Sequence, residues 1–181
     1  MEMPAPPLLI LDLDECLIHA HESPLDRPAD FLIGPFHVYQ RPHVREFLQS
    51  ASQWYQLAVW SSATSDYVEA IVRRIQPQDL SWQFVWGRDR CTRRYDMEFM
   101  EEGYVKDLKK VKRLGFPLER ILFVDDTPSK LARNYGNALY IKPFEASLQD
   151  EELLYLTKYL ERIRHAENFR KMEKRNWRHV K

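Results

Sequence analysis

Four carboxylates stand directly after two apolar runs in this sequence. Asp12 and Asp14 follow the first run with one residue between them, and Asp125 and Asp126 follow the second. In extended backbone, residues i and i+2 point the same way, so Asp12 and Asp14 can face one site. Carboxylates brought close together repel each other unless a cation or a shared proton intervenes. The four acids therefore predict a site for a hard cation with oxygen ligands, and Mg²⁺ is the usual ion where phosphate is also present.

Donors for a phosphoryl group accompany these acids. Ser61 and Ser62 follow a third apolar run and supply hydroxyl and backbone N–H groups, while Lys106 supplies a positive charge just before a helical pattern. An acid nucleophile, a metal ion, hydrogen-bond donors and a lysine together fit phosphoryl transfer. Each residue alone has a common structural explanation as a helix cap, a turn residue or a solvated side chain. The prediction therefore depends on their occurring together.

The elements that must position these residues alternate along the chain. Apolar runs at residues 8–11, 57–60 and 121–124 are typical of strands buried in a parallel sheet, with 138–141 as a last strand. Amphipathic helical patterns between them start near residues 42, 65, 107 and 127. This alternation predicts an α/β fold with a parallel sheet covered on both faces, whose ligand lies beyond the carboxyl ends of the strands. Residues 81–86 fit either a core strand or an insert.

The length of 181 residues predicts a single domain, which we place at residues 8–163 after a flexible N-terminus at 1–7. Residues 31–40 look like two short extended pieces around a Gly-Pro turn, which predicts an antiparallel insert. A long helical pattern begins at residue 148. Its last part predicts a helical tail over 164–181, which is basic. Residues 158–181 contain nine Lys or Arg against three Glu.

Composition limits the classes of partner. Lys plus Arg and Asp plus Glu are equal at 27 each, so no overall field draws the protein to nucleic acid or to anionic lipid. No segment approaches the roughly 18 to 20 apolar residues of a bilayer span, so we expect no membrane partner. Two cysteines and the absence of a signal-peptide pattern favour a reducing compartment. We expect a cytoplasmic protein, or a nuclear one if the source is eukaryotic.

A receiver domain of a two-component system also places acids, a hydroxyl and a lysine at strand ends. Its acid pair follows the first strand, its phosphorylated Asp comes in mid-chain, and its hydroxyl and lysine come later. In this sequence the second acid pair follows Lys106. The order of the residues excludes a receiver domain.

Five segments together carry a resemblance to a known family. The run Asp-Leu-Asp-Glu-Cys at 12–16 resembles the Asp-x-Asp-x-Thr signature of the haloacid dehalogenase superfamily of phosphohydrolases. Further blocks resemble the sequence blocks of the NLI-interacting-factor-like branch of this superfamily. That branch includes the RNA polymerase II C-terminal-domain phosphatases. The blocks lie at residues 12–19, 41–48, 59–64, 104–108 and 121–128. They follow the family order and extend over most of the chain, which makes the resemblance specific.

The resemblance implies a Mg²⁺-dependent phosphatase that works in two steps. By this analogy Asp12 attacks phosphorus and becomes an aspartyl phosphate, and Asp14 protonates the leaving oxygen and then activates the water. Ser61 and Lys106 would hold the phosphoryl oxygens. The metal would bind Asp12, the backbone carbonyl of Asp14, and one or both of Asp125 and Asp126, with Asp126 favoured as a direct ligand.

The same resemblance implies a three-layer Rossmann-like fold with strand order 3-2-1-4-5 and no large cap domain. It places Arg88 near the substrate phosphate, where a solvated arginine is an equally good interpretation. Three positions depart from the family pattern: Cys16 stands where Thr is usual, Ser61 replaces Thr, and the second acid pair is Asp-Asp where many relatives have Asp-Asn. All three leave catalysis plausible.

The substrate stays open at this stage. The 31–40 segment looks shorter than the insert with which polymerase-tail phosphatases grip their peptide, so a phosphoprotein and a small phosphoester both fit. A binding module of the same fold without catalysis is an alternative, although such proteins usually lose an acid of the first motif. The basic tail could also make weak contact with nucleic acid and direct the enzyme to polynucleotide ends, but a solvated terminal helix is the favoured explanation of its charge.

Overall fold

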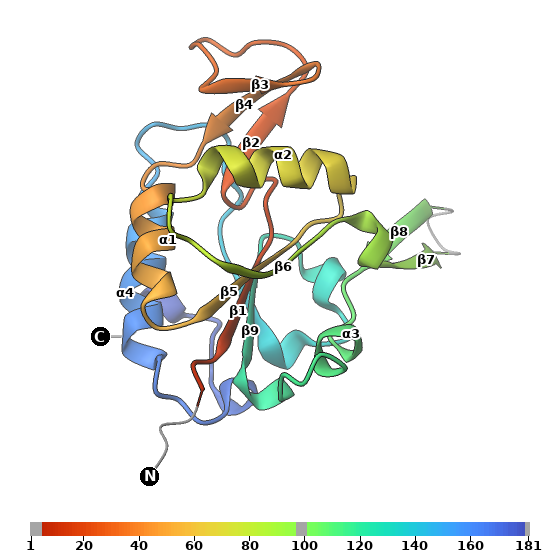
Figure 1. The fold of residues 1–181 in the computed structure, drawn as a ribbon, viewed down its shortest axis with the longest axis vertical. Helices are drawn as coiled ribbons and strands as arrows, with labels where there is room; N and C mark the ends of the chain where they lie inside the picture. The colour runs from red at the N-terminus through yellow and green to blue at the C-terminus, as the bar shows by residue number, and fades with distance from the viewer. Residues whose placement is uncertain (1–4, 97–100, 180–181) are drawn as a thin grey trace.

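The computed structural model describes residues 5–96 and 101–179. Its centre is a five-stranded parallel sheet, ordered β10–β9–β1–β5–β6 (Figure 1). Numbered among themselves along the chain, these strands have the order 5-4-1-2-3, which is the predicted order 3-2-1-4-5 from the other edge. The strands are β1 (Leu8–Leu11), β5 (Gln56–Trp60), β6 (Trp82–Trp86), β9 (Ile121–Asp125) and β10 (Ala138–Tyr140).

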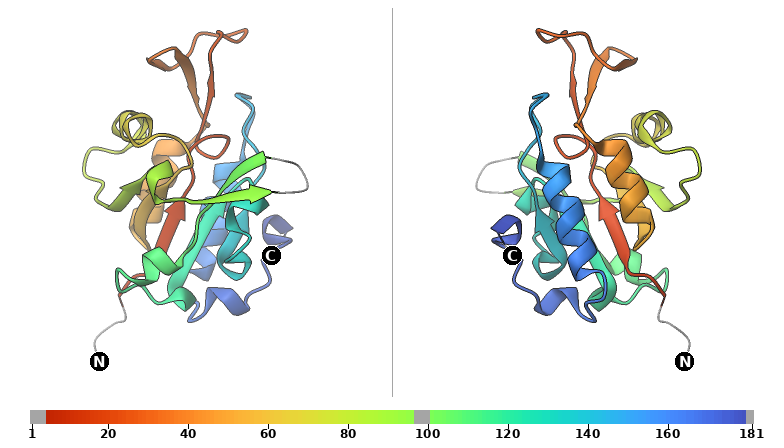
Figure 2. Two further views of the ribbon diagram at one scale, coloured as in Figure 1. Left: turned by 90° about the vertical axis from the view of Figure 1, so that its right-hand side faces the viewer. Right: turned by 90° about the vertical axis from the view of Figure 1, so that its left-hand side faces the viewer.

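Alternating residues of the central strands enter two separate cores. Leu9 and Leu11 of β1 belong to one buried cluster, and Leu8 and Ile10 belong to the other. A strand buried on both faces needs no polar alternation, which is why these segments read as continuous apolar runs. The first cluster lies under α1 (Val44–Ser52), α2 (Ser65–Ile75) and α4 (Glu152–Ile163). The short α3 (Lys109–Lys112) covers the other face, which completes three layers (Figure 2).

Two small antiparallel sheets interrupt this plan. The first contains β2 (Ile18–His21), β3 (Phe31–Ile33) and β4 (Phe36–Gln40) in the order β2–β4–β3. It confirms the antiparallel insert predicted at 31–40 and adds β2, and it projects beyond the carboxyl-terminal end of the central strands (Figure 2). The second pairs β7 (Thr92–Asp96) with β8 (Glu101–Val105) and has no counterpart in the sequence predictions. Residues 82–86, left open from the sequence, form an edge strand of the central sheet.

Three helical predictions differ from the structure. The segment near residue 107 forms only the single turn of α3, and the segment after Thr127 forms the 3₁₀ turn Pro128–Leu131. The tail is not a helix beyond α4: two 3₁₀ turns, Phe169–Lys171 and Trp177–His179, follow it, and their aromatic residues are buried in the core. Burial of two large rings explains why the tail folds back instead of continuing as a solvated helix.

The predicted N-terminal segment is described only in part. Residues 1–4 lie outside the described residues. Pro7 is buried, and its carbonyl oxygen accepts a hydrogen bond from the backbone N–H of Gln56 at 2.9 Å. The domain limits themselves stay a prediction. Across residues 5–96 and 101–179, none of the helices combines the length and apolar character that a bilayer crossing demands.

Candidate active site

Three of the four predicted carboxylates meet at one edge of the sheet. Asp12 follows β1 and Asp125 ends β9, and these strands are parallel neighbours, so their carboxyl ends coincide. The backbone N–H of Asp12 continues the pairing by donating to the carbonyl of Val124 at 3.0 Å. One carboxylate oxygen from each of Asp12, Asp125 and Asp126 lies within 4.8 Å of the others. Asp12 and Asp125 are buried, and Asp126 is half-buried.

Asp14 lies apart from this three-carboxylate cluster. Its side chain points to α2, where the hydroxyl of Tyr67 donates a hydrogen bond to Asp14 Oδ1 at 2.8 Å. Burial, opposed by this hydrogen bond and aided by the nearby charge of Asp12, raises the pKa of Asp14 to about 6. The chain turns sharply just after Asp14, where Glu15 has a φ of 58°. Tyr67 is a site residue that the sequence patterns did not single out.

Lys106 lies between two of the predicted carboxylates, Asp12 and Asp125. Its side chain is fully buried, and its Nζ lies 2.6 Å from Asp125 Oδ2 and 3.1 Å from Asp12 Oδ1. Burial works to lower the pKa of Lys106, but the charges of Asp12 and Asp125 outweigh it and raise the pKa above its ordinary value. The ammonium group therefore stays charged and offsets the repulsion between the two acids.

A second lysine, Lys130, was missed from the sequence. Its Nζ lies 3.0 Å from Asp12 Oδ2 and 4.0 Å from Asp126 Oδ1, and it comes from the 3₁₀ turn after β9. Burial works to lower the pKa of Lys130, but Asp12 and Asp125 raise it further than burial lowers it. One signal could have found Lys130: it stands four residues after Asp126, the spacing at which opposite charges approach on a helical turn.

The two lysines decide the charge state of Asp12. Burial works to raise the pKa of Asp12, but Lys106 and Lys130 outweigh it and hold the pKa below its ordinary value. The backbone N–H of Leu13 also donates to Asp12 Oδ1 at 2.9 Å. Asp125 differs, because burial and the charge of Asp12 raise its pKa to about 6 despite Lys106. Asp12 is thus an ionised carboxylate at neutral pH, which is the form that can act as a nucleophile.

Ser61 stands at the same edge of the sheet as the acids. It follows β5, which is paired with β1 on the side away from β9, and it is buried. Its backbone N–H donates to the carbonyl of Trp86 at 2.9 Å, and its Oγ accepts from the N–H of Ala63 at 3.0 Å. These bonds fix the loop that carries the hydroxyl.

Ser62 and Arg88 contact each other and not the acids. Arg88 Nε donates to the carbonyl oxygen of Ser62 at 2.7 Å, and the guanidinium carbon lies 5.1 Å from the ring centroid of Tyr104. Arg88 is exposed. The two residues therefore border a surface beside the Ser61 loop, and their predicted contact with a substrate phosphate stays a prediction.

Cys16, the departure from the usual Thr, is buried behind the site. Its Sγ lies 3.9 Å from the carbonyl of Val124, and burial raises the pKa of the thiol well above its ordinary value. The thiol is a weak donor that replaces a hydroxyl of similar size, so the packing under Asp12 is kept. The main-chain carbonyl of Cys16 accepts from Arg41 Nη1 at 2.9 Å, which ties this turn to the rest of the fold.

Comparison with known proteins identifies the family. The family model for "NLI interacting factor-like phosphatase" matches residues 7–170. The CTD nuclear envelope phosphatase 1 homolog of Drosophila melanogaster is 31% identical over 183 residues, covering 93% of this chain and 72% of that protein. CTD nuclear envelope phosphatase 1B of Danio rerio is 30% identical, with coverage of 93% and 71%. The human CTD small phosphatase-like protein is 30% identical, with coverage of 84% and 54%.

The names of three similar proteins correct one prediction. We expected a cytoplasmic protein from cysteine content and the lack of a signal pattern. Similar curated proteins from fly, fish and frog are named nuclear envelope phosphatases, which contradicts that expectation. Cysteine usage separates reducing from oxidising compartments, but it carries no information on place within the cell.

A solved structure supports the fold. The structure of Fcp1, described as an essential RNA polymerase II CTD phosphatase, superimposes with a TM-score of 0.61 at 18% identity. The match covers 88% of this chain, which spans about half the length of the Fcp1 chain. At this identity the likeness concerns the fold. Together with the matched family model, it establishes that the chain belongs to the NLI interacting factor-like phosphatase family and is a phosphatase of the haloacid dehalogenase type.

Proposed function

We propose that this protein is a Mg²⁺-dependent phosphomonoesterase that removes phosphate from phosphoserine or phosphothreonine in a protein, through an aspartyl phosphate on Asp12. The observation that carries the proposal is the state of Asp12. This buried carboxylate is kept ionised by two lysines and lies beside two further acids. The relatives' names, which describe CTD phosphatases, support a phosphoprotein as the substrate class.

The donor set fits a magnesium ion. Asp12, Asp125 and Asp126 offer three carboxylate oxygens within 4.8 Å of one another, and hard oxygen ligands suit Mg²⁺. Burial and the charge of Asp12 both raise the pKa of Asp125, and a cation bound beside these carboxylates would favour the ionised form of Asp125. The backbone carbonyl of Asp14 would complete the protein ligands. When bound, Mg²⁺ draws charge from the phosphoryl oxygens and allows them to approach Asp12.

In the first step an oxygen of Asp12 forms a bond to phosphorus, and the bond between phosphorus and the substrate oxygen breaks. Asp14, with a pKa of about 6, donates its proton to the leaving serine or threonine oxygen. Lys106 stabilises the charge that grows on the phosphoryl oxygens, and Ser61 supplies donors from the neighbouring strand end. The product of this step is aspartyl phosphate with a free hydroxyl on the substrate.

In the second step water attacks the aspartyl phosphate. Asp14, now ionised, takes a proton from the water as its oxygen bonds to phosphorus. The bond between phosphorus and Asp12 breaks, so inorganic phosphate leaves and the Asp12 carboxylate is restored. The hydrogen bond from Tyr67 holds the Asp14 side chain in place for both proton transfers.

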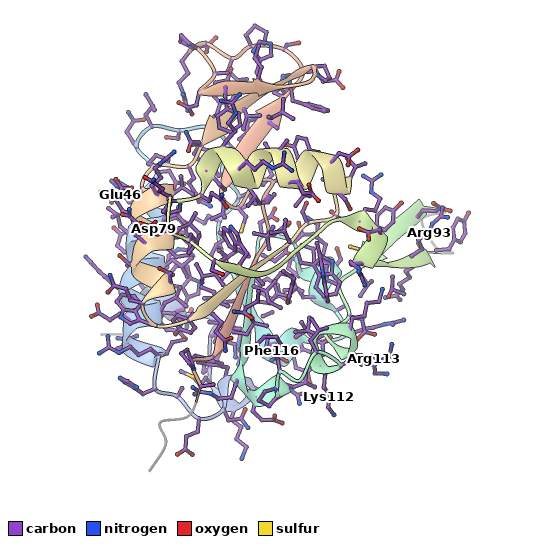
Figure 3. The ribbon with its side chains drawn as sticks, viewed as in Figure 1. Glu46, Asp79, Arg93, Lys112, Arg113 and Phe116 are labelled. Carbon is purple, nitrogen blue, oxygen red and sulfur yellow. The ribbon has the colours of Figure 1, made fainter. Side chains whose placement is uncertain are left out.

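Replacement of Asp12 tests the proposal. We expect Asp12→Asn to lower kcat on a phosphoserine peptide by at least about 10³-fold, because an amide is a far weaker nucleophile than a carboxylate. Asp79→Asn, which changes an exposed carboxylate (Figure 3), is the matched control and should retain wild-type activity. Mass spectrometry of quenched wild-type enzyme should show a phosphoryl group on Asp12. Robust turnover by Asp12→Asn, or phosphate on another residue, would contradict the nucleophile assignment.

The alternative of a binding module without catalysis has no observation in its favour. Asp12 and Asp14 are both present, and Lys106 is in contact with Asp12.

A further inference from the structure

Neither chemical step of the proposed mechanism uses Lys130, although its ammonium group contacts Asp12. Asp12 has two oxygens, and each faces a different lysine: Oδ1 lies 3.1 Å from Lys106 and Oδ2 lies 3.0 Å from Lys130. Lys130 also reaches toward Asp126, with Nζ 4.0 Å from Oδ1. Lys106, by contrast, makes its second contact with Asp125. The two lysines therefore divide the three-carboxylate cluster between them.

The contacts of Lys130 overlap those expected of the metal. A divalent cation bound to the cluster needs an oxygen of Asp12 and an oxygen of Asp126, and Lys130 lies against an oxygen of each. An ammonium group and a divalent cation repel each other strongly at such separations. Both cations cannot keep the same carboxylate oxygens at once.

The two lysines differ in their freedom to leave. The side chain of Lys106 is 0% exposed and is enclosed in the core, whereas the side chain of Lys130 is 22% exposed. The Lys130 backbone is anchored, because its carbonyl accepts from the N–H of Lys106 at 2.8 Å and its N–H donates to the carbonyl of Thr127 at 3.2 Å. A lysine side chain on a fixed backbone can swing its ammonium group into solvent while its stem stays in place.

We propose that Lys130 is a displaceable counter-ion of the metal site: its ammonium group competes with the divalent cation for Asp12 and Asp126 and moves out to solvent when the cation binds. Lys130 thereby lowers the affinity for metal and keeps the carboxylate cluster neutralised whenever metal is absent. It is a positioning residue, since it acts through the metal and the carboxylates. This inference rests on the metal site of the proposed function and makes no assumption about turnover.

Metal affinity gives the first test. We expect metal-stripped Lys130→Met to bind Mn²⁺, measured by calorimetry or by electron paramagnetic resonance, about tenfold more tightly than wild type, because the ion no longer displaces a partly buried ion pair. The variant should have a lower melting temperature than wild type without metal and a larger rise in melting temperature with Mg²⁺. Lys112→Met, which removes an exposed lysine of α3 (Figure 3), is the matched control and should leave all three quantities unchanged.

Chemical labelling of the wild-type protein gives a second test that needs no variant. An amine-acetylating reagent, read out by mass spectrometry, should modify Lys130 several-fold faster with saturating Mg²⁺ than without metal. Lys106 should resist labelling in both conditions because it is buried, and Lys112 should react equally in both. Faster labelling separates displacement of the side chain from simple repulsion of the metal by a lysine that stays in place.

The outcomes distinguish this inference from the proposed function. Equal or weaker Mn²⁺ binding by a folded Lys130→Met, or unchanged labelling of Lys130 on addition of Mg²⁺, would overturn the displacement of Lys130 while leaving the metal site standing. Failure of both wild type and Lys130→Met to bind Mn²⁺ would overturn the metal site and the inference with it. Tighter binding together with faster labelling would establish the competition.

Discussion

Asp12 and Asp14 are separated by one residue, yet their surroundings give them opposite protonation behaviour. Asp12 contacts two ammonium groups, which outweigh its burial and hold its pKa low. Asp14 is turned toward α2 and accepts a hydrogen bond from a neutral donor, the Tyr67 hydroxyl, so burial raises its pKa to about 6. Two acids with pKa values pushed apart are suited to different roles, one as nucleophile and one as acid and base.

At this scale the hydrogen bond from Tyr67 can be tested by Tyr67→Phe. The hydroxyl favours the ionised form of Asp14, so its loss should raise the pKa of Asp14 further, by about one unit. A general acid must be protonated, so activity on an alkyl phosphate should fall as pH rises through this pKa. We therefore expect the alkaline limb of the kcat profile to move to higher pH. We also expect kcat to fall several-fold, with KM little changed, because Asp14 loses the hydrogen bond that holds its side chain in place.

The matched comparison for Tyr67→Phe is a pH profile on a substrate with a good leaving group, such as an aryl phosphate. Such a leaving group needs no proton from Asp14, so its first step should be less sensitive to the variant. A Tyr67→Phe profile that coincides with wild type on both substrates would show that Tyr67 has no part in placing Asp14.

At the scale of the elements, one buried side chain, Arg41, joins the insert to the turn that follows Asp14. Arg41 follows β4 and is fully buried, and its guanidinium donates to both carboxylate oxygens of Asp150 at 2.8 Å. It also donates to the carbonyls of Cys16 and Lys142, each at 2.9 Å. The first carbonyl belongs to the turn just after Asp14, and the second to the segment after β10. Arg41 thus connects three segments that lie far apart in the sequence.

Removal of this arginine should be strongly destabilising. We expect Arg41→Met to lower the free energy of unfolding by about 3 kcal/mol, because Asp150 and two carbonyls lose their partner together. Arg73→Met is the matched control: it breaks the exposed i, i+4 pair with Glu69, whose contribution is typically below about 0.5 kcal/mol. Urea denaturation monitored by circular dichroism measures both. Equal stabilities of the two variants would contradict the connecting role of Arg41.

At the scale of the whole molecule, the C-terminal segment, residues 164–179, packs back against the rest of the fold. Phe169 and Trp177 are buried in the same cluster as α1 and α4, and the indole N–H of Trp177 donates to the carbonyl of Tyr140 at 2.8 Å. Arg178 is ion-paired with the buried Glu152 at the start of α4. Lys174 donates to three backbone carbonyls, including that of Gly136 at 3.0 Å. These basic side chains make contacts within the fold, and the weak nucleic-acid contact predicted for the tail stays a prediction.

Loss of the Trp177 anchor should release the tail without disturbing catalysis. We expect Trp177→Ala to lower the free energy of unfolding by about 3 kcal/mol, through the cavity and the lost hydrogen bond. Limited trypsin digestion should then cut within residues 164–179 faster than in wild type, while kcat below the melting temperature stays unchanged. Wild-type resistance to trypsin in the variant would show that the tail is held by other contacts.

The sequence by itself determined the central sheet and the positions of its acids. Strands buried on both faces have continuous apolar sequences, which makes them recognisable. Because parallel strands have their carboxyl ends at one edge of the sheet, Asp12, Asp125 and Ser61 could be assigned to one site. The order of the motif blocks then indicated the family. These inferences need only local patterns and the geometry common to all parallel sheets.

The tertiary structure alone decided which side chains meet across long separations. Lys130 stands 118 residues from Asp12 and Tyr67 stands 53 residues from Asp14, and no local pattern encodes contacts that depend on strand register and on where a turn ends. The path of the tail was likewise decided by tertiary contacts: the sequence predicts that the helix continues over 164–181, but Phe169 and Trp177 are instead buried in the core beside α4. Helix propensity is a weak local preference, whereas burial of two large rings is worth several kcal/mol, so packing determined the path of the chain.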